Sequence, residues 1–187
     1  NGDKSVVNKL IKDDRIKAVS FVGSTPVAKN IYETSAISGK RCQALGGAKN
    51  HALILPDADI DYTTDQLISA AYGSSGQRCM ALSVAVVFSD IKDEFIQDLE
   101  RKVQKLKFGL DDLHSNSFGP LVSKEHLESV KNYIDMSEGE GARVLIDGRD
   151  FLKRKNSNNG YFLGPTIIDN VSCLLYTSPS PRDIGDS

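Results

Sequence analysis

A cysteine with a cationic neighbour stands on a turn of small residues and is the first candidate for chemistry. Cys79 follows Arg78 in the segment GSSGQRCMA at residues 73–81. Small residues let a sulfur approach a carbonyl carbon closely, and an adjacent guanidinium favours the thiolate, which is the nucleophilic form. The pattern therefore indicates covalent catalysis by a thiol. The alternative is a small buried hydrophobic residue, which is the more common role of an isolated free cysteine.

Arg78 has two functional interpretations and a structural one. It could favour the thiolate of Cys79, or its planar fork could receive the carboxylate of a substrate. The structural alternative is an ion pair at the surface or behind the site. His51 is a further candidate, as a general base, although a structural role is favoured.

Other polar residues are given structural roles. Lys49 and Asn50 follow a pair of glycines, where turn formation is the simplest account. Cys42, in a predicted strand, is interpreted as a buried or inert thiol. His114 and His126 lack a partner pattern and are expected to be exposed to solvent.

A strand followed by a helix is predicted near the start of the chain. Residues 16–22 have the composition of a buried strand, and residues 27–35 that of a helix. A helix that starts just after Gly23 and Ser24 offers unpaired N–H groups and a positive dipole end, which suits a phosphate group. A plain turn with a Ser or Thr cap is the alternative.

Further elements must position the Cys79 turn. Strands are predicted at residues 42–45, 52–55 and 81–88, and a helix at residues 63–72 leads into the turn. Gly46 and Gly47, between the first two of these strands, suit a close approach of the backbone to a ligand or a neighbouring segment. This alternation of strands and helices predicts an open α/β sheet.

The second half of the chain is predicted to form helices and a strand that pack in the core. One helical stripe of apolar residues predicts a helix, on which Asp98 and Lys102 are spaced to pair. The basic run Arg101, Lys102, Lys105 and Lys107 is interpreted as a solvated face. A second amphipathic helix is expected around residues 127–134, then a strand at 143–146 and a polar segment at 150–159. The apolar stripe consists of Ile91, Phe95, Leu99, Val103 and Leu106.

Composition excludes several classes of function. The 187 residues are 40% hydrophobic with a formal net charge of −2, which suits a globular α/β protein and gives no electrostatic bias toward nucleic acid or anionic membranes. No apolar run is long enough to cross a bilayer. The three cysteines have neither metal-ligand spacing nor the spacing of a disulfide framework, so no metal is expected and a reducing compartment is indicated.

A series of short motifs in a fixed order resembles the aldehyde dehydrogenase superfamily. The motifs are FVGST (21–25), LGG (45–47), KN (49–50), DAD (57–59) and GQRC (76–79). The forms GAKNH and GQRCMA resemble most closely the branch of methylmalonate-semialdehyde dehydrogenases, which are acylating. The resemblance spans residues 1–172 and implies an α/β fold, in which the end of a Rossmann-like cofactor domain is joined to most of a catalytic domain.

The resemblance implies a role for each site residue. Cys79 would attack the aldehyde carbon, its backbone N–H would form part of an oxyanion hole, and hydride would pass to NAD, leaving a thioester. Gly23, Ser24, Leu45 and Gly46 would bind NAD, and Ser24 would contact its pyrophosphate. Hydrolytic members carry a glutamate where this chain has Ala44, so the thioester would be passed to coenzyme A rather than to water.

The resemblance also implies the substrate and the setting. The full protein would convert methylmalonate or malonate semialdehyde to propionyl-coenzyme A or acetyl-coenzyme A in valine and pyrimidine catabolism. A mitochondrial, homo-oligomeric and in particular tetrameric enzyme is expected. Two alternatives stay open: a hydrolytic aldehyde dehydrogenase with a relocated base, and an inactive fragment or structural protein.

The ends of the domains are predicted from the same comparison. Residues 1–45 are expected to be the tail of the NAD-binding domain and residues 46–172 a partial catalytic domain. Residues 173–187 resemble a translated sequencing adapter and are expected to be non-native. The chain alone is expected to be an inactive internal fragment, since segments that complete the oxyanion hole and hold the adenosine are missing from it.

Overall fold

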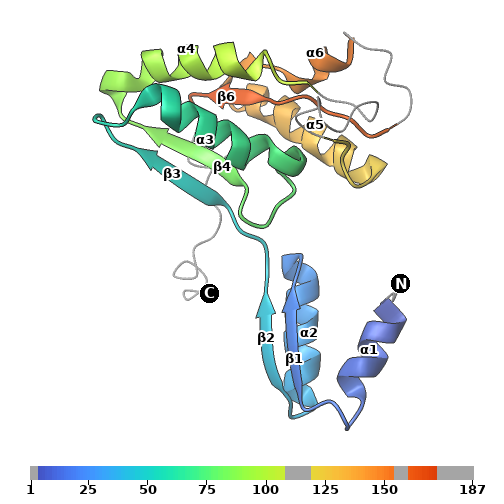
Figure 1. Ribbon diagram of the computed structural model, residues 1–187. Helices are drawn as coiled ribbons and strands as arrows, with labels where there is room; N and C mark the ends of the chain where they lie inside the picture. The colour runs from blue at the N-terminus through green and yellow to red at the C-terminus, as the bar shows by residue number, and fades with distance from the viewer. Residues whose placement is uncertain (1–3, 108–118, 154–159, 172–187) are drawn as a thin grey trace. The chain divides into compact units, whose positions relative to one another are not determined.

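The computed structural model of the protein describes residues 4–107, 119–153 and 160–171 (Figure 1). The described chain divides between Ala48 and Lys49 into two compact units, whereas the sequence analysis placed the boundary after residue 45. The first unit contains α1 (Lys4–Lys12), β1 (Ala18–Val22), α2 (Thr25–Ile37) and β2 (Arg41–Leu45). The second contains β3 (Asn50–Ile54), α3 (Ile60–Tyr72), η1 (Gly73–Gly76), β4 (Leu82–Val87), η2 (Ser89–Ile91), α4 (Lys92–Val103), α5 (Lys124–Gly139), β5 (Arg143–Ile146), α6 (Gly148–Lys153) and β6 (Ile167–Asp169).

The first unit is a strand–helix–strand arrangement in which β1 and β2 run parallel. Such strands need a crossover, and α2 supplies it. Exposure alternates along both strands, so that Phe21 and Ala44 lie opposite each other on the half-buried face, while Val22 and Leu45 lie on the exposed face. The predicted strand at residues 16–22 is therefore present but shorter, and the prediction that it is buried is wrong. Because α2 packs on the strand pair from one face, alternate side chains stay in solvent.

The second unit begins with another parallel pair, β3 and β4, connected through α3. The N-cap of α3 is Asp59, whose side chain accepts a hydrogen bond from the N–H of Tyr62 at 3.0 Å. The helix ends at Tyr72, and Gly73 follows it at the start of the turn that carries Cys79. The strands and the helix predicted from sequence around this turn are thus confirmed, each within a few residues.

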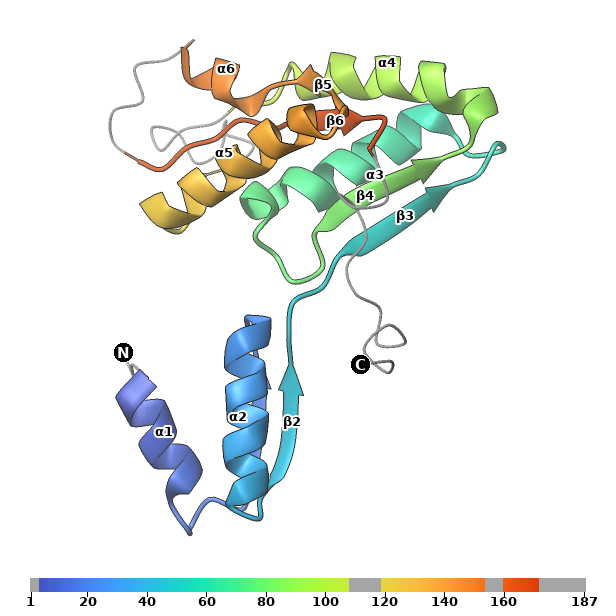
Figure 2. The same cartoon turned by 180° about the vertical axis from the view of Figure 1, so that it is seen from behind.

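The rest of the second unit is two helices, an antiparallel strand pair and a short third helix, seen from the opposite side in Figure 2. The strand at residues 143–146 is confirmed as β5, which pairs with β6, a strand that the sequence analysis missed. The prediction of a polar segment from residue 150 is wrong for its first residues, because α6 extends to Lys153 and buries Phe151. Residues 154–159 of that prediction lie outside the described residues.

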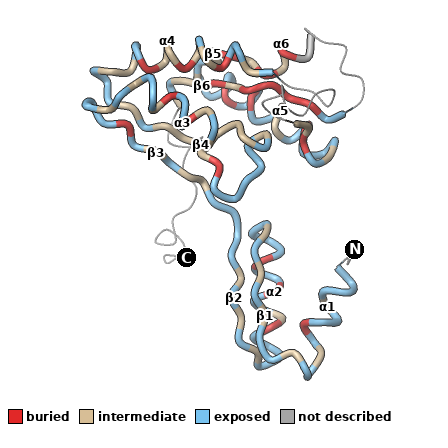
Figure 3. The backbone as a smooth tube through the Cα atoms, viewed as in Figure 1, coloured by how far each residue is buried: buried red, intermediate tan, exposed pale blue. Residues whose placement is uncertain are grey.

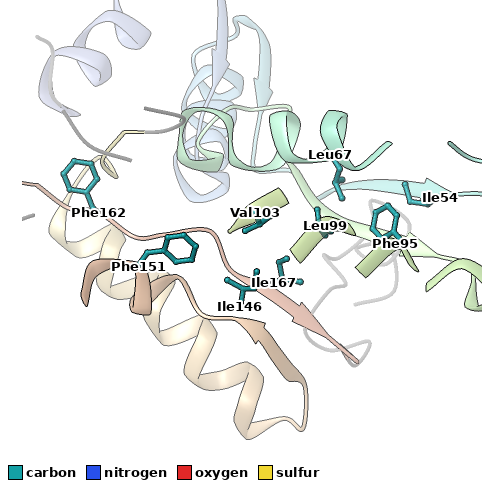
Figure 4. Close-up of a cluster of buried hydrophobic side chains, with 9 residues drawn as sticks. All are labelled: Ile54, Leu67, Phe95, Leu99, Val103, Ile146, Phe151, Phe162 and Ile167. Carbon is teal, nitrogen blue, oxygen red and sulfur yellow. The ribbon is translucent and has the colours of Figure 1, made fainter. Parts of the chain in front are cut away.

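Apolar side chains from both halves of the second unit form a core (Figure 4), and Figure 3 marks the buried positions along the backbone. The stripe predicted on α4 is confirmed, since Phe95, Leu99 and Val103 are buried. They share this core with residues from β3, α3, β5, α6 and β6, and β4 packs against it, so the core fixes the helix that leads into the Cys79 turn and the strand that follows it. The other members of this core are Ile54, Leu67, Ile146, Phe151, Phe162 and Ile167. Within the described chain, no helix is long and apolar enough to span a membrane.

A charge cluster around the partly buried Lys102 joins α3 to α4. The ammonium of Lys102 lies 2.9 Å from Asp61, 2.8 Å from Asp65 and 3.3 Å from Asp98, and its side chain is 12% exposed. The predicted pairing with Asp98 is confirmed, but Lys102 does not belong to a solvated face. Burial by itself lowers the pKa of Lys102, and the hydrogen bonds to the carboxylates more than offset this, so its pKa is raised.

Thr64, which is fully buried, supports this cluster and gives it a pH dependence. Its hydroxyl donates to Asp98 at 2.5 Å, and this hydrogen bond, followed by those from Arg101 and Lys102, lowers the pKa of Asp98 to about 2. A depressed carboxyl pKa contributes stability that is present above the unfolded value of 3.8 and is lost as the pH falls through about 2.

Replacement of Thr64 by valine is therefore expected to lower the free energy of unfolding by about 2 kcal/mol at neutral pH, because it removes a hydrogen bond to a charged group. The loss should shrink as the pH falls from about 4 to about 2, where Asp98 becomes protonated. Urea unfolding at several pH values measures both effects. Thr63→Val, at the neighbouring half-buried threonine, is the control. An equal loss at all pH values would contradict the assignment.

Candidate active site

Cys79 lies exposed on a turn whose backbone conformation is unusual. In η1, Ser74 and Ser75 have φ of 55° and Gly76 has φ of 69°. Non-glycine residues seldom adopt the left-handed region, so a surrounding structure must hold these two serines there. The N–H of Ala81 donates to the carbonyl of Arg78 at 3.1 Å, which closes a four-residue turn with Cys79 as its second residue.

One side of the turn is attached to the segment at residues 119–122. The hydroxyl of Ser75 donates to the carbonyl of Gly119 at 2.6 Å. The amide of Gln77 donates to the carbonyl of Pro120 at 3.3 Å and accepts from the N–H of Val122 at 3.0 Å. These contacts join residues more than 40 positions apart in the chain, and they hold the left-handed serines in place.

Asn50 attaches the other side of the turn, a role that sequence reasoning did not assign to it. Its side-chain amide donates to the carbonyl of Cys79 at 3.1 Å and to the carbonyl of Ala81 at 3.0 Å. The interpretation of Asn50 as a turn former is wrong, since it is the first residue of β3. Among the described residues, the backbone N–H of Cys79 has no acceptor. The carbonyl of Cys79 is thus held while its N–H stays available.

Arg78 lies folded back over its own loop. A methyl group added at Gly73 would meet the Arg78 guanidinium at 3.0–3.2 Å, so the absence of a side chain there makes room for the cation. Arg78 is exposed, and it forms no ion pair with any described residue. The ion-pair interpretation of Arg78 therefore finds no partner within residues 4–107, 119–153 and 160–171.

The predicted cofactor residues come together in the first unit, at the carboxyl ends of β1 and β2. The N–H of Gly23 donates to the carbonyl of Leu45 at 3.1 Å. Thr25 accepts from the N–H of Gly47 at 3.0 Å, and a methyl group on Gly46 would lie 2.7 Å from the Thr25 hydroxyl. Glycine is needed at position 46 because two backbone segments and this side chain meet there.

Ser24 is the N-cap residue of α2, but its hydroxyl makes no capping hydrogen bond. The N–H groups of Ser24, Thr25 and Val27 have no backbone acceptor in the described chain, and Pro26 has no N–H to donate. The end of α2 therefore presents unpaired donors and an exposed hydroxyl, the arrangement that favours an anionic group. The hydrogen bonding therefore does not support the alternative of a plain turn capped by Ser24.

The remaining candidate residues are Ala44, His51, Cys42, His126 and His114. Ala44 lies in β2 with no proton acceptor on its side chain. A ring nitrogen of His51 lies 2.8 Å from the carbonyl of Lys49. Cys42 is half-buried, and His126 is exposed on the first turn of α5 as expected. His114 lies outside the described residues, which contain no group of three or more His, Cys, Asp or Glu side chains placed to hold a metal ion.

A cavity of about 600 Å³ lies away from the Cys79 turn, between β4 and β6. Its lining is largely apolar, and neither Cys79 nor Arg78 belongs to it. The strands beside it are β4 and β6. Within the described chain, each of them is paired along one edge. The polar groups that a reaction would need are gathered on the Cys79 turn instead, so we place the candidate active site there.

Known proteins resemble this chain in sequence and in fold. The family model of the aldehyde dehydrogenase family matches residues 1–174. The malonate-semialdehyde dehydrogenase 1 of Oceanobacillus iheyensis is 48% identical over 174 residues, which are 92% of this chain and 35% of that protein. The chain thus spans about a third of the length of the curated relatives that it matches.

Two crystal structures show the same fold. The methylmalonate-semialdehyde dehydrogenase of Oceanimonas doudoroffii is 53% identical, with a TM-score of 0.87 over 92% of this chain and 35% of that one. A Sinorhizobium meliloti protein described as a methylmalonate-semialdehyde dehydrogenase, crystallised with NAD, is 42% identical, with a TM-score of 0.89 over 95% and 37%. The predicted α/β aldehyde dehydrogenase fold is confirmed. The ordered motifs, the fold and these matches agree, and the chain belongs to the aldehyde dehydrogenase family.

Proposed function

We propose that this chain carries the nucleophile and part of the cofactor site of an NAD-dependent, coenzyme A-acylating semialdehyde dehydrogenase. The observation that carries the proposal is Cys79, exposed on a turn that is attached from both sides, with its carbonyl held and its N–H available. The names of the relatives support a semialdehyde as the substrate. The activity belongs to the full-length protein, by which we mean this chain joined to the remaining segments of the family.

The groups at the end of α2 fit a dinucleotide. The unpaired N–H groups of Thr25 and Val27 and the hydroxyl of Ser24 offer donors to a pyrophosphate, and Gly46 leaves the backbone accessible beside them. When bound, NAD supplies a hydride acceptor. The neighbour crystallised with NAD supports this assignment. Gly23, Ser24, Leu45 and Gly46 are accordingly proposed as cofactor residues.

Cys79 would act as a covalent catalyst. Its sulfur attacks the aldehyde carbon, the carbonyl electron pair moves to oxygen, and the backbone N–H of Cys79 donates to that oxygen. With bound NAD as the hydride acceptor, the same carbon would regain its carbonyl and Cys79 would carry a thioester. The exposed position of the sulfur allows a substrate to reach it without displacing a core side chain.

Arg78 is proposed to bind the carboxylate of the semialdehyde. Its guanidinium lies on the same loop as the sulfur, is exposed, and forms no ion pair with a described residue. A free planar fork can bind a carboxylate through two parallel hydrogen bonds. This would hold the reacting end of a short semialdehyde acid near Cys79. Methylmalonate and malonate semialdehyde are both acids of this kind.

Coenzyme A is proposed as the acyl acceptor because of Ala44. A methyl group cannot take a proton from water, so deacylation by general-base hydrolysis has no base at this position. The thioester would persist until the thiol of coenzyme A attacks it, with release of the Cys79 thiolate. Loss of carbon dioxide from the substrate's carboxylate would yield acetyl- or propionyl-coenzyme A.

Omission of coenzyme A is the test of this proposal. With malonate semialdehyde and NAD, steady-state NADH formation by the full-length protein should fall by about 100-fold without coenzyme A, the contribution of a missing general base. A single burst of NADH equal to the enzyme concentration should remain. NADH formation as fast without coenzyme A as with it would favour a hydrolytic enzyme. Absence of both turnover and burst would favour a structural protein.

Oligomeric state and location remain predictions from the resemblance. A homotetramer is proposed for the full-length protein, and size-exclusion chromatography with light scattering tests it. For the cellular location, we propose the mitochondrion in a eukaryotic host. The curated relatives that the chain matches come from bacteria.

A further inference from the structure

We propose that Asn50 is a positioning residue for Cys79, which sets the orientation of the peptide that follows the nucleophile. This inference rests on the proposed function for its catalytic consequence. Its structural part stands on the two hydrogen bonds from one side-chain amide to the carbonyls of Cys79 and Ala81, at 3.1 and 3.0 Å.

The turn at Cys79 needs such a residue because its closing hydrogen bond does not determine the type of β-turn. The bond from the N–H of Ala81 to the carbonyl of Arg78 occurs in more than one type of β-turn. These types differ by a flip of the central peptide, which here joins Cys79 to Met80. The flip reverses the direction of the Cys79 carbonyl, so a donor fixed on one side of the turn selects one orientation.

Asn50 can make this selection because of where it lies. It is the first residue of β3, a strand paired with β4 immediately after the turn, and the register of the pair shifts between Asn50 and His51. An amide nitrogen has two N–H donors, and both are used here, on carbonyls two residues apart. The anchor is thus the first residue of a strand, while the carbonyls that it holds belong to the nucleophile and to the residue two positions after it.

For catalysis, the hydrogen bonds from Asn50 would fix the position of the Cys79 sulfur and of the Cys79 backbone N–H. The carbonyl of Cys79 accepts from Asn50, whereas the N–H of Cys79 has no acceptor among the described residues. Holding the carbonyl restrains the main chain on which both the sulfur and that N–H are carried. Misplacement of a reacting group by about 1 Å lowers rates by about 100-fold in enzymes.

Asn50→Asp in the full-length protein is the decisive variant, because aspartate keeps the shape of asparagine and removes both donors. We expect kcat for NADH formation to fall by about 10-fold to 100-fold, with KM for NAD changed by less than about threefold. Asn50→Ala should behave similarly, whereas Asn50→Gln, which keeps two N–H donors, should recover part of kcat. Asn132→Asp, at an exposed asparagine on α5, is the matched control and should match the parent.

Amide hydrogen exchange of the peptide spanning residues 76–82 reads the turn without relying on any activity. Exchange should be faster in Asn50→Asp than in Asn132→Asp, while peptides from α4 exchange at the parental rate. A parent protein that forms no NADH would refute the proposed function and leave this readout intact. Unchanged exchange with unchanged kcat, or losses shared by α4, NAD binding and kcat alike, would overturn the role of Asn50.

Discussion

Replacement of Cys79 by alanine is expected to lower the rate of NADH formation by the full-length protein by about 10⁴-fold, because no other described residue on that turn carries a thiol. The exposed sulfur and its available backbone N–H are the groups that the proposed mechanism uses. The dissociation constant of NAD should stay within about threefold of the parent value, since the proposed cofactor contacts come from other residues. Single-turnover absorbance at 340 nm measures the rate, and isothermal titration calorimetry with NAD measures the dissociation constant.

The control for this variant is Cys42→Ala. Cys42 is also a free thiol and also follows an arginine, but it lies half-buried in β2 rather than exposed on a turn. Its removal should leave kcat within about twofold of the parent, as for most substitutions away from a site. If Cys79→Ala retained more than a tenth of the activity, the covalent mechanism would have to be abandoned.

Replacement of Gly148 by alanine is expected to destabilise the protein by about 3 kcal/mol, at the upper end of the usual cost of overpacking. A methyl group at this position would lie 2.0 Å from the carbonyl oxygen of Gly164 and 2.7 Å from the hydroxyl of Thr166. The first of these atoms belongs to backbone, which cannot turn aside like a flexible side chain. The same contact supports two hydrogen bonds, from Gly148 to Thr166 and from Gly164 to Gly148, both 3.0 Å long.

Gly139→Ala is the matched control for this prediction. Gly139 ends α5, and a methyl group there would meet nothing within 4 Å. Alanine in a helix is more favourable than glycine by up to about 1 kcal/mol, so this variant should be neutral or slightly stabilised. Urea unfolding followed by circular dichroism compares the two. Equal stability of the two variants would show that the Gly148 to Gly164 contact can relax.

Local patterns were sufficient for most helices and strands of the second unit. The apolar spacing of α4 predicted its buried face, because a helix repeats every 3.6 residues whatever lies beside it. The same logic failed for the first residues of the segment after 150. Phe151 belongs to a buried cluster that includes residues of β5, β6 and α4, and no local pattern reports such a cluster. The burial expected of residues 16–22 failed for the converse reason, since burial depends on what covers a strand.

The sequence by itself determined the family and the identity of the candidate nucleophile. Ordered motifs around Gly23, Gly46 and Cys79 are local strings, and they can be read without knowing which distant residues meet. The sequence also indicated that a phosphate site could form after Gly23, since a helix start offers its N–H groups wherever it occurs.

Only the tertiary structure decided how Cys79 is held. Asn50 precedes Cys79 by 29 positions, and Gln77 meets Val122 across 45 positions, so neither contact leaves a signal in local spacing. The structure also decided that Lys102 is enclosed by three aspartates rather than solvated. These features arise when the core of α3, α4 and the strands brings distant segments together, because hydrogen bonds act over about 3 Å and cannot be read from residues that are far apart in sequence.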